Sequence, residues 1–177
     1  LGSISLKGTT KEARYGNPLP RIAECPNGLI NAIGLQNPGV DKVIEVELKK
    51  LDEVYKKPVI ANVGGHSFEE YTTTVAKFND VDKVFAVELN ISCPNVQGGG
   101  MAFGTNPDTV EELVREIKKV STKPIIVKLS PNVTDIVSIA KACEAAGADG
   151  ISLINTLLGM RIDLRTKKPV IANKMGG

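Results

Sequence analysis

Apolar residues recur at helical spacing in four stretches of the chain, and short apolar runs lie between these stretches. The stripe over residues 40–55 predicts the first helix, and further helices are predicted over 67–78, 107–120 and 134–146. The intervening runs predict strands over 58–62, 84–90, 125–129 and 150–155. This alternation indicates an α/β fold in which parallel strands are joined by right-handed crossovers.

Residues at the expected helix ends support these boundaries. Ser67 and Glu70 have the spacing of a capping box, in which each residue satisfies a backbone N–H of the first turn. Asn106 stands directly before Pro107, which is the usual order of an N-cap and the first helical residue. Gly147 is placed to end the last helix, because glycine tolerates the left-handed conformation found there.

The segments outside this alternation are predicted to be more irregular. Residues 1–7 alternate apolar and polar positions and predict a strand, whereas 8–37 is rich in Gly, Pro and Asn. That stretch contains two short β-like pieces near 21–23 and 29–33, and long irregular stretches in compact domains are usually functional. Residues 161–164 and 170–172 flank a polar turn and predict a β-hairpin.

Composition narrows the class of protein. Hydrophobic residues make up 42% and charged residues 24% of the chain, which is ordinary for a globular domain. The net charge of +2 gives no reason to expect a nucleic acid or a membrane surface as partner. The cysteines at 25, 93 and 143 lie far apart and lack a CxxC or His-rich companion, so they favour a reducing, cytoplasmic compartment over a zinc or disulfide framework.

The two ends of the sequence are unusual for a complete domain. The chain begins at Leu1 almost directly with an apolar run and stops at Gly176-Gly177 without a closing element. Because natural ends are usually loose and polar, we expect residues 1–177 to be a single but incomplete domain of a longer protein.

Polar residues at the ends of the predicted strands indicate where a ligand would bind, because parallel α/β folds bind ligands at the carboxyl ends of their strands. Amides and lysines there suit a flat heteroaromatic ligand with carbonyl and N–H edges and some negative charge. None of the final positions carries a carboxylate, a histidine or a metal-ligand cluster. The alternative is that polar residues end strands only because loops are polar. The positions are Lys7, Asn62, Asn90, Lys128 or the adjacent Ser130, and Asn155.

Cys93 follows one of these strand ends, in the segment NISCPN at residues 90–95. A thiol among amides and hydroxyls could serve as base or nucleophile once its pKa is lowered, although a lone cysteine is more often a small core residue. We expect Cys143 to be such a core residue and Cys25 to lie in a turn. His66, the single histidine, is expected to be a solvated loop residue.

Several segments resemble one enzyme family. The chain is similar over its whole length to class 1 dihydroorotate dehydrogenases, the soluble FMN enzymes of pyrimidine biosynthesis. The most specific signals are NISCPN at 90–95 and NAIGLQN at 31–37. Residues 102–105 and 157–161 look more like the catalytic subunit of subclass 1B than like subclass 1A. The other matching segments are 7–10, 14–18, 128–132 and 154–156.

The resemblance implies a TIM (β/α)8 barrel, of which this chain would cover about strands two to six with β-hairpin insertions. A full barrel needs eight strands and about 250 residues, more than the 177 present here. The implied reaction is oxidation of dihydroorotate to orotate in de novo synthesis of UMP, with FMN taking a hydride. This piece alone is then expected to be inactive.

The family's functional residues can be carried over to the matching positions of this sequence. Cys93 would be the general base that removes the C5 proton of dihydroorotate. Gly8 is a departure, since the family usually has Ser or Thr beside the lysine. The residues implied for substrate are Lys7, Asn31, Ala32, Ile33, Gly34, Leu35, Asn90, Asn95, Asn155 and Thr156, and those implied for FMN are Lys7, Gly8, Asn62, Asn90, Lys128 and Ile154.

A subclass 1B enzyme would form a homodimer and pair with a subunit that carries FAD and a 2Fe–2S cluster. The resulting heterotetramer would pass electrons to NAD⁺, with no metal bound by this chain itself. Other interpretations stay open at this point. They are another barrel flavoprotein acting on a pyrimidine base, a Schiff-base aldolase that uses Lys128, and an inactive fragment.

Overall fold

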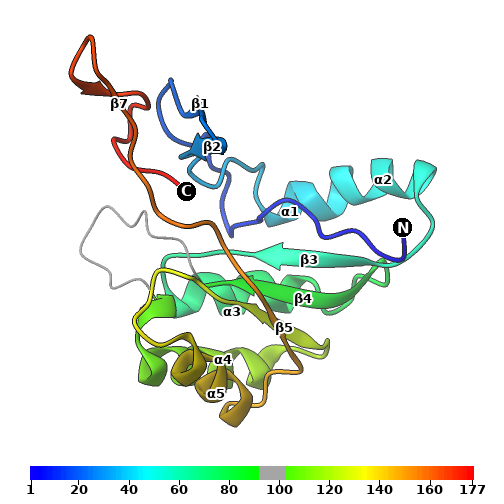
Figure 1. Ribbon diagram of the computed structural model, residues 1–177. Helices are drawn as coiled ribbons and strands as arrows, with labels where there is room; N and C mark the ends of the chain where they lie inside the picture. The colour runs from blue at the N-terminus through cyan, green and yellow to red at the C-terminus, as the bar shows by residue number, and fades with distance from the viewer. Residues whose placement is uncertain (92–102) are drawn as a thin grey trace.

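A four-stranded parallel sheet forms the centre of the molecule (Figure 1). The structure, a computed structural model, describes residues 1–91 and 103–177. The strands are β3 (Val59–Val63), β4 (Val84–Asn90), β5 (Ile125–Lys128) and β6 (Gly150–Ser152), paired in that order. The predicted α/β class and all four strands are confirmed, but β6 ends at Ser152 instead of residue 155. The chain leaves the ladder there and rejoins it only where the Asn155 N–H donates to the Leu129 carbonyl at 2.9 Å.

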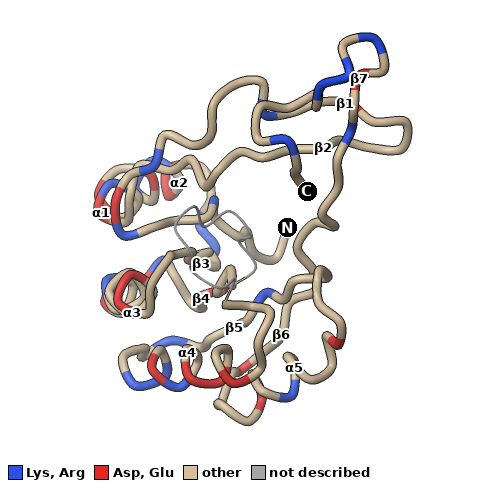
Figure 2. Tube along the Cα trace, turned by 90° about the vertical axis from the view of Figure 1, so that its left-hand side faces the viewer, with Lys and Arg blue, Asp and Glu red and all other residues tan. Residues whose placement is uncertain are grey.

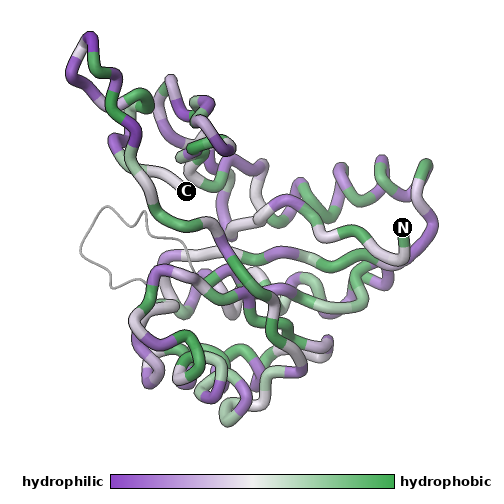
Figure 3. The backbone as a smooth tube through the Cα atoms, viewed as in Figure 1, coloured by the Kyte–Doolittle hydropathy of each residue, from purple (hydrophilic) through white to green (hydrophobic). Residues whose placement is uncertain are grey.

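Helices lie along the outside of the strands, as Figure 2 shows. The predicted helix over 40–55 forms as α1 (Val40–Lys42), a π-helical turn η1 (Val43–Glu47) and α2 (Leu48–Val54). The other predicted helices form as α3 (Phe68–Lys77), α4 (Pro107–Val120) and α5 (Ile136–Ala145), with a short 3-10 turn η2 (Phe103–Thr105) before α4. In Figure 3 hydrophobic and hydrophilic positions alternate along these helices, so each buries one side. None of the helices in the described part of the chain is long and apolar enough to cross a membrane.

The hydrophobic core lies between the sheet and these helices. Val87 and Leu89 of β4 are fully buried in one cluster with Leu113 and Ile117 of α4. Burying one such side chain contributes about 1.5–3 kcal/mol. Because side chains alternate along a strand, this packing directs the residues between and after them to the opposite face of the sheet.

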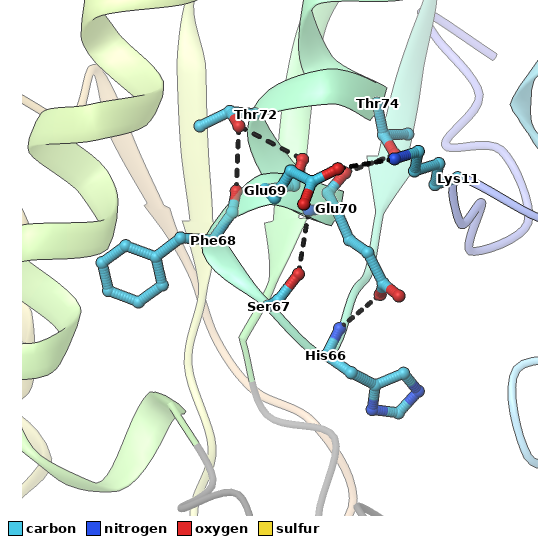
Figure 4. Close-up of polar contacts among 8 residues, drawn as sticks. All are labelled: Lys11, His66, Ser67, Phe68, Glu69, Glu70, Thr72 and Thr74. Carbon is cyan, nitrogen blue, oxygen red and sulfur yellow. Dashed lines mark hydrogen bonds and ion pairs between the residues drawn. The ribbon is translucent and has the colours of Figure 1, made fainter.

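The helix ends are formed largely as predicted, as Figure 4 shows for α3. The Ser67 hydroxyl accepts the Glu70 N–H at 3.1 Å, which confirms the first half of the capping box. The Glu70 carboxylate accepts from the His66 N–H at 2.7 Å, one residue earlier than the box requires. The Asn106 side chain caps α4 by accepting the Thr109 N–H at 3.1 Å, and Gly147 after α5 has the expected positive φ of 88°.

The N-terminal segment runs beside β3 but does not form the predicted strand over 1–7. Ser5 is bridged to Ile60 and Thr9 to Val63, both in parallel. The segment thus advances four residues while β3 advances three, and this slip prevents a ladder of consecutive pairs. Its Leu6 N–H still donates to the Ile60 carbonyl at 2.8 Å.

Two antiparallel hairpins project on the same side of the molecule in Figure 1. The first joins β1 (Ile22–Cys25) and β2 (Gly28–Asn31), close to the predicted β-like pieces. The second joins β7 (Ile162–Asp163) and β8 (Lys168–Pro169), so the predicted hairpin is confirmed although its second strand lies nearer the turn than 170–172. The Asp163 carboxylate tightens that turn by accepting the Arg165 N–H at 2.8 Å and the Thr166 N–H at 3.1 Å.

Candidate functional site

The carboxyl ends of three neighbouring strands bring predicted ligand-binding residues together. Asn62 of β3 stands opposite Glu88 of β4, and Asn90 at the end of β4 stands opposite Lys128 at the end of β5. Since Glu88 and Asn90 alternate with the helix-facing Leu89, all of these side chains belong to the face of the sheet turned away from the helices. The predicted clustering at the strand ends is therefore confirmed for this group.

A carboxylate lies in the middle of this group, and sequence reasoning missed it. The Asn62 amide N–H donates to the Glu88 carboxylate at 2.6 Å, and Asn62 is only 7% exposed. The strand-end pattern points only to the last residue of each strand, whereas Glu88 stands two residues before the end of β4. The alternation that places Asn90 on the inner face also places Glu88 there, and this signal could have found it.

Asn90 is held from two sides. Its side-chain oxygen accepts the Asn155 amide N–H at 3.1 Å, and its backbone carbonyl accepts the Tyr71 hydroxyl at 2.7 Å. Tyr71 comes from α3 and is almost fully buried. The Asn155 side-chain oxygen in turn accepts the Thr156 N–H at 2.8 Å. Three residues predicted to bind substrate thus form one hydrogen-bonded chain, and Tyr71 is an additional support that the sequence did not reveal.

Leu35, in the irregular N-terminal stretch, lies close to the same strand ends. A Cβ at Gly8 would lie 3.1 Å from the Asn62 side-chain oxygen and 3.5 Å from the Leu35 side chain, and one at Gly64 would also lie 3.5 Å from Leu35. Gly8 and Gly64 therefore let Leu35 and Asn62 approach the backbone closely. Gly34, with a φ of +78°, leaves room for Asn17, because a Cβ there would meet the Asn17 side chain at 2.7 Å.

Asn31, a predicted substrate residue at the end of the first hairpin, is linked to Thr156 by contacts with Gly177. The Asn31 side chain donates to the Gly177 carbonyl at 3.2 Å, and Gly177 fits so tightly against Thr156 that a Cβ would overlap its hydroxyl. Ala32 is buried in a small cluster with Ile30 and Ile171. The Ile33 carbonyl accepts the Asn17 N–H at 2.9 Å. The structure gives neither Ala32 nor Ile33 a hydrogen bond to the strand-end group in its described part.

The remaining predicted site residues are exposed or lie outside the described part of the chain. Lys7 is exposed on the segment beside β3, and Ile154 after β6 is half exposed. No ion pair within residues 1–91 and 103–177 includes Lys7 or Lys128. Cys93 and Asn95 lie outside the described residues, but their flanks are joined beside Asn90, where the Gly104 N–H donates to the Ile91 carbonyl at 3.0 Å.

The other two cysteines differ from a reactive thiol. Cys143 is fully buried in the main core, and burial raises the pKa of its thiol to about 11. It is therefore protonated at neutral pH and inert as a nucleophile, as expected for a core residue. Cys25 ends β1 directly before the turn to β2, also as expected. Within the described residues, no group of three or more His, Cys, Asp or Glu side chains could hold a metal ion.

His66 is not the solvated loop residue that the sequence suggested. Both of its ring nitrogens are buried, and neither has a hydrogen-bond partner in the described part of the chain. Burial lowers the pKa of the ring below its usual 6.5, Arg14 lowers it further, and the Glu70 carboxylate opposes these effects. Arg14 is distant in sequence, which is why the local pattern around Gly64-Gly65 did not predict this environment.

Known proteins of similar sequence match this chain from end to end. A family model described as dihydroorotate dehydrogenase matches residues 1–177. The chain is 60% identical to the "Dihydroorotate dehydrogenase B (NAD(+)), catalytic subunit" of Enterococcus faecalis, in an alignment that covers 100% of the chain and 57% of that relative. The protein of the same name from Geobacillus kaustophilus is 58% identical, with 100% and 56% covered. The chain thus spans a little more than half the length of these relatives.

Solved structures give a weaker match. The carboxyl transferase domain of Rhizobium etli pyruvate carboxylase is 13% identical, with a TM-score of 0.48, and the match covers 62% of this chain and 18% of that one. Nothing about fold or function follows from a likeness at this level.

The environment of His66 predicts a pH-dependent contribution to stability. Because its folded pKa is lowered, the unfolded state binds more protons between that pKa and 6.5, and stability rises with pH in this window. The wild type should therefore lose more stability than His66→Gln between pH 7.5 and pH 5. Urea midpoints of both proteins at the two pH values measure this difference. An equal loss in both would show that His66 does not titrate abnormally.

Proposed function

The chain belongs to the dihydroorotate dehydrogenase family, and we propose that the protein oxidises dihydroorotate to orotate with FMN, in de novo synthesis of UMP. The observation that carries the proposal is the meeting of Asn62, Asn90 and Lys128 at the carboxyl ends of adjacent parallel strands. Amides provide donors and acceptors for a pyrimidine edge, and lysine provides positive charge. The names of the curated relatives support the same reaction.

We propose that the sheet is part of a TIM barrel, covering about strands two to six. The N-terminal segment lies beside β3, and β3 to β6 follow in the order of the sequence, which is the strand order of such a barrel. In Figure 2 the helices lie outside the strands, as they do in the barrel architecture. The two hairpins would then be insertions at the end where the strand carboxyl ends lie.

The residues at this end fit a flavin. Gly8 places backbone without a side chain next to the Asn62 oxygen, since a Cβ there would lie 3.1 Å from it. Asn62, Asn90 and Lys128 provide an acceptor, further amide groups and a cation, which match the carbonyl and N–H edge of a flavin. The residues that would hold FMN are Lys7, Gly8, Asn62, Asn90, Lys128 and Ile154. FMN supplies the hydride acceptor of the reaction when it is bound.

The chain's own residues would then bind and orient the substrate. Asn90, Asn155 and Thr156 form the hydrogen-bonded chain described above, and Asn31 joins them through Gly177. These side chains are suited to the amide edges and carboxylate of dihydroorotate. Lys7 and Lys128 would favour negative charge that develops on the bound ligands. The full proposed substrate set adds Ala32, Ile33, Gly34, Leu35 and Asn95, which contribute backbone groups or an amide.

Removal of the C5 proton is proposed for Cys93, whose flanking residues lie beside Asn90. Cys93→Ser in the whole protein, as its gene encodes it, should keep FMN and orotate binding. Turnover at pH 7 should fall about 100-fold or more, because a serine hydroxyl is a far weaker base than a thiolate. Steady-state kinetics measure the loss, and Cys25→Ser is the control because Cys25 lies on the first hairpin. Near-normal turnover of Cys93→Ser would remove Cys93 from the mechanism.

The proposed final electron acceptor is NAD⁺, reached through a second subunit. The relatives are called catalytic subunits of an NAD(+) enzyme, which supports a partner. An iron–sulfur centre needs clustered cysteines, whereas this sequence has three that lie far apart. It also lacks a GxGxxG motif at a strand-to-helix turn. We therefore propose a cytoplasmic heterotetramer, in which a homodimer of catalytic chains pairs with subunits carrying FAD and a 2Fe–2S cluster.

This assignment predicts a division of labour between the subunits. The catalytic protein alone should have its FMN reduced by dihydroorotate but should form NADH only after the FAD and iron–sulfur subunit is added. Stopped-flow absorbance of the flavin and of NADH, with and without that subunit, tests the expectation. Dihydrouracil is the substrate control. Rapid NADH formation by the isolated protein would refute the partner, and equal reduction by dihydrouracil would refute the substrate.

A further inference from the structure

We propose that Glu88 is a positioning residue for flavin binding, which acts by fixing the side-chain amide of Asn62. This inference rests on the proposed FMN-dependent function. Neither the strand-end pattern nor the family resemblance points to Glu88, and its contact with Asn62 follows from the pairing of β3 with β4.

The pairing leaves the Asn62 amide a single orientation. Asn62 and Glu88 are direct neighbours in the parallel register, and the distance from the Asn62 side-chain nitrogen to the Glu88 carboxylate is 2.6 Å. An ionised carboxylate can only accept hydrogen bonds, so the amide nitrogen must face Glu88. A bond of this length to a charged acceptor is also stronger than one between neutral groups.

The consequence is that the Asn62 oxygen faces Gly8. A Cβ built on Gly8 would lie 3.1 Å from this oxygen, which shows that the two are adjacent and that no side chain of residue 8 stands beside the oxygen. An oxidised flavin presents one ring N–H between two carbonyl groups, and an amide oxygen is the matching acceptor. If the amide turned over, it would present a donor to a donor.

Glu88 has little other use for its charge. No ion pair within residues 1–91 and 103–177 includes it, and it stands on the inner face between Ala86 and Asn90. A carboxylate in such a place costs stability unless it is hydrogen-bonded. A neutral residue would fill the position without that cost. Within the described part of the chain, the contact that offsets the cost is the hydrogen bond from Asn62 to the Glu88 carboxylate.

The first test measures FMN affinity in the whole protein by quenching of flavin fluorescence. Glu88→Leu should raise the Kd for FMN about tenfold or more, since Asn62 loses the acceptor that orients it. Asn62→Ala should weaken binding similarly, and the double variant should bind no more weakly than Asn62→Ala alone. Glu112→Leu, which removes an exposed carboxylate from α4, is the matched control. Unchanged FMN affinity in Glu88→Leu, or additive losses in the double variant, would overturn the proposal.

A second test does not depend on the folding of Glu88→Leu. Asn62→Asp alone places two carboxylates against each other and should weaken FMN binding. Adding Glu88→Gln should restore affinity to within about threefold of wild type, because the introduced amide can donate to one oxygen of the introduced carboxylate and leave the other oxygen toward Gly8. Failure of this rescue would also overturn the proposal. If the wild-type protein does not bind FMN at all, the proposed function itself fails, so the two failures are distinguishable.

Discussion

The register of β4 between β3 and β5 is the constraint on which the site depends. It places Asn62 beside Glu88 and Asn90 beside Lys128, while Val87 and Leu89 of the same strand are buried against the helices. A shift of one residue would turn Glu88 and Asn90 into the core and the valine and leucine toward the inner face. Hydrophobic burial on the outer face therefore fixes which polar groups meet on the inner face.

The helix layer also supports the site directly. Tyr71 of α3 reaches through the core to hold the Asn90 carbonyl, and its ring meets that of Phe103 edge to face at 6.0 Å between centroids. Phe103 begins the turn η2. The N–H of the next residue, Gly104, donates to the carbonyl of Ile91, which directly follows Asn90. The end of β4 is thus fixed from the helix side and from the chain that returns toward α4.

The sequence predicted best those elements whose pattern is strictly local. The predicted bounds of β4 match the observed ones, and α4 follows from its apolar stripe and the Asn106 cap. The prediction of a strand over 1–7 is wrong because the pairing of this segment includes a slip against β3, which no pattern within the segment reveals. The burial of His66 was missed for the same reason, since Arg14 and the segment around it come from far away in sequence.

The candidate site was predicted in part for similar reasons. Alternation within a strand and the position of its last residue located Asn62, Asn90 and Lys128. Alternation alone places Glu88 on the inner face, but its hydrogen bond with Asn62 follows only from cross-strand pairing. The hydrogen bond between Asn155 and Asn90 follows only from the path of the chain after β6. The role of Cys93 remains a prediction from the family resemblance, because that residue lies outside the described part of the chain.

We propose that the strand ends of β3, β4 and β5 hold a flavin that dihydroorotate reduces. An anaerobic titration of the purified whole protein with dihydroorotate, followed by flavin absorbance, tests it most directly. We expect a yellow protein whose absorbance is bleached by dihydroorotate and whose bleaching is strongly slowed in Lys128→Ala. A protein that carries no flavin, or a flavin that dihydroorotate leaves oxidised, would contradict it.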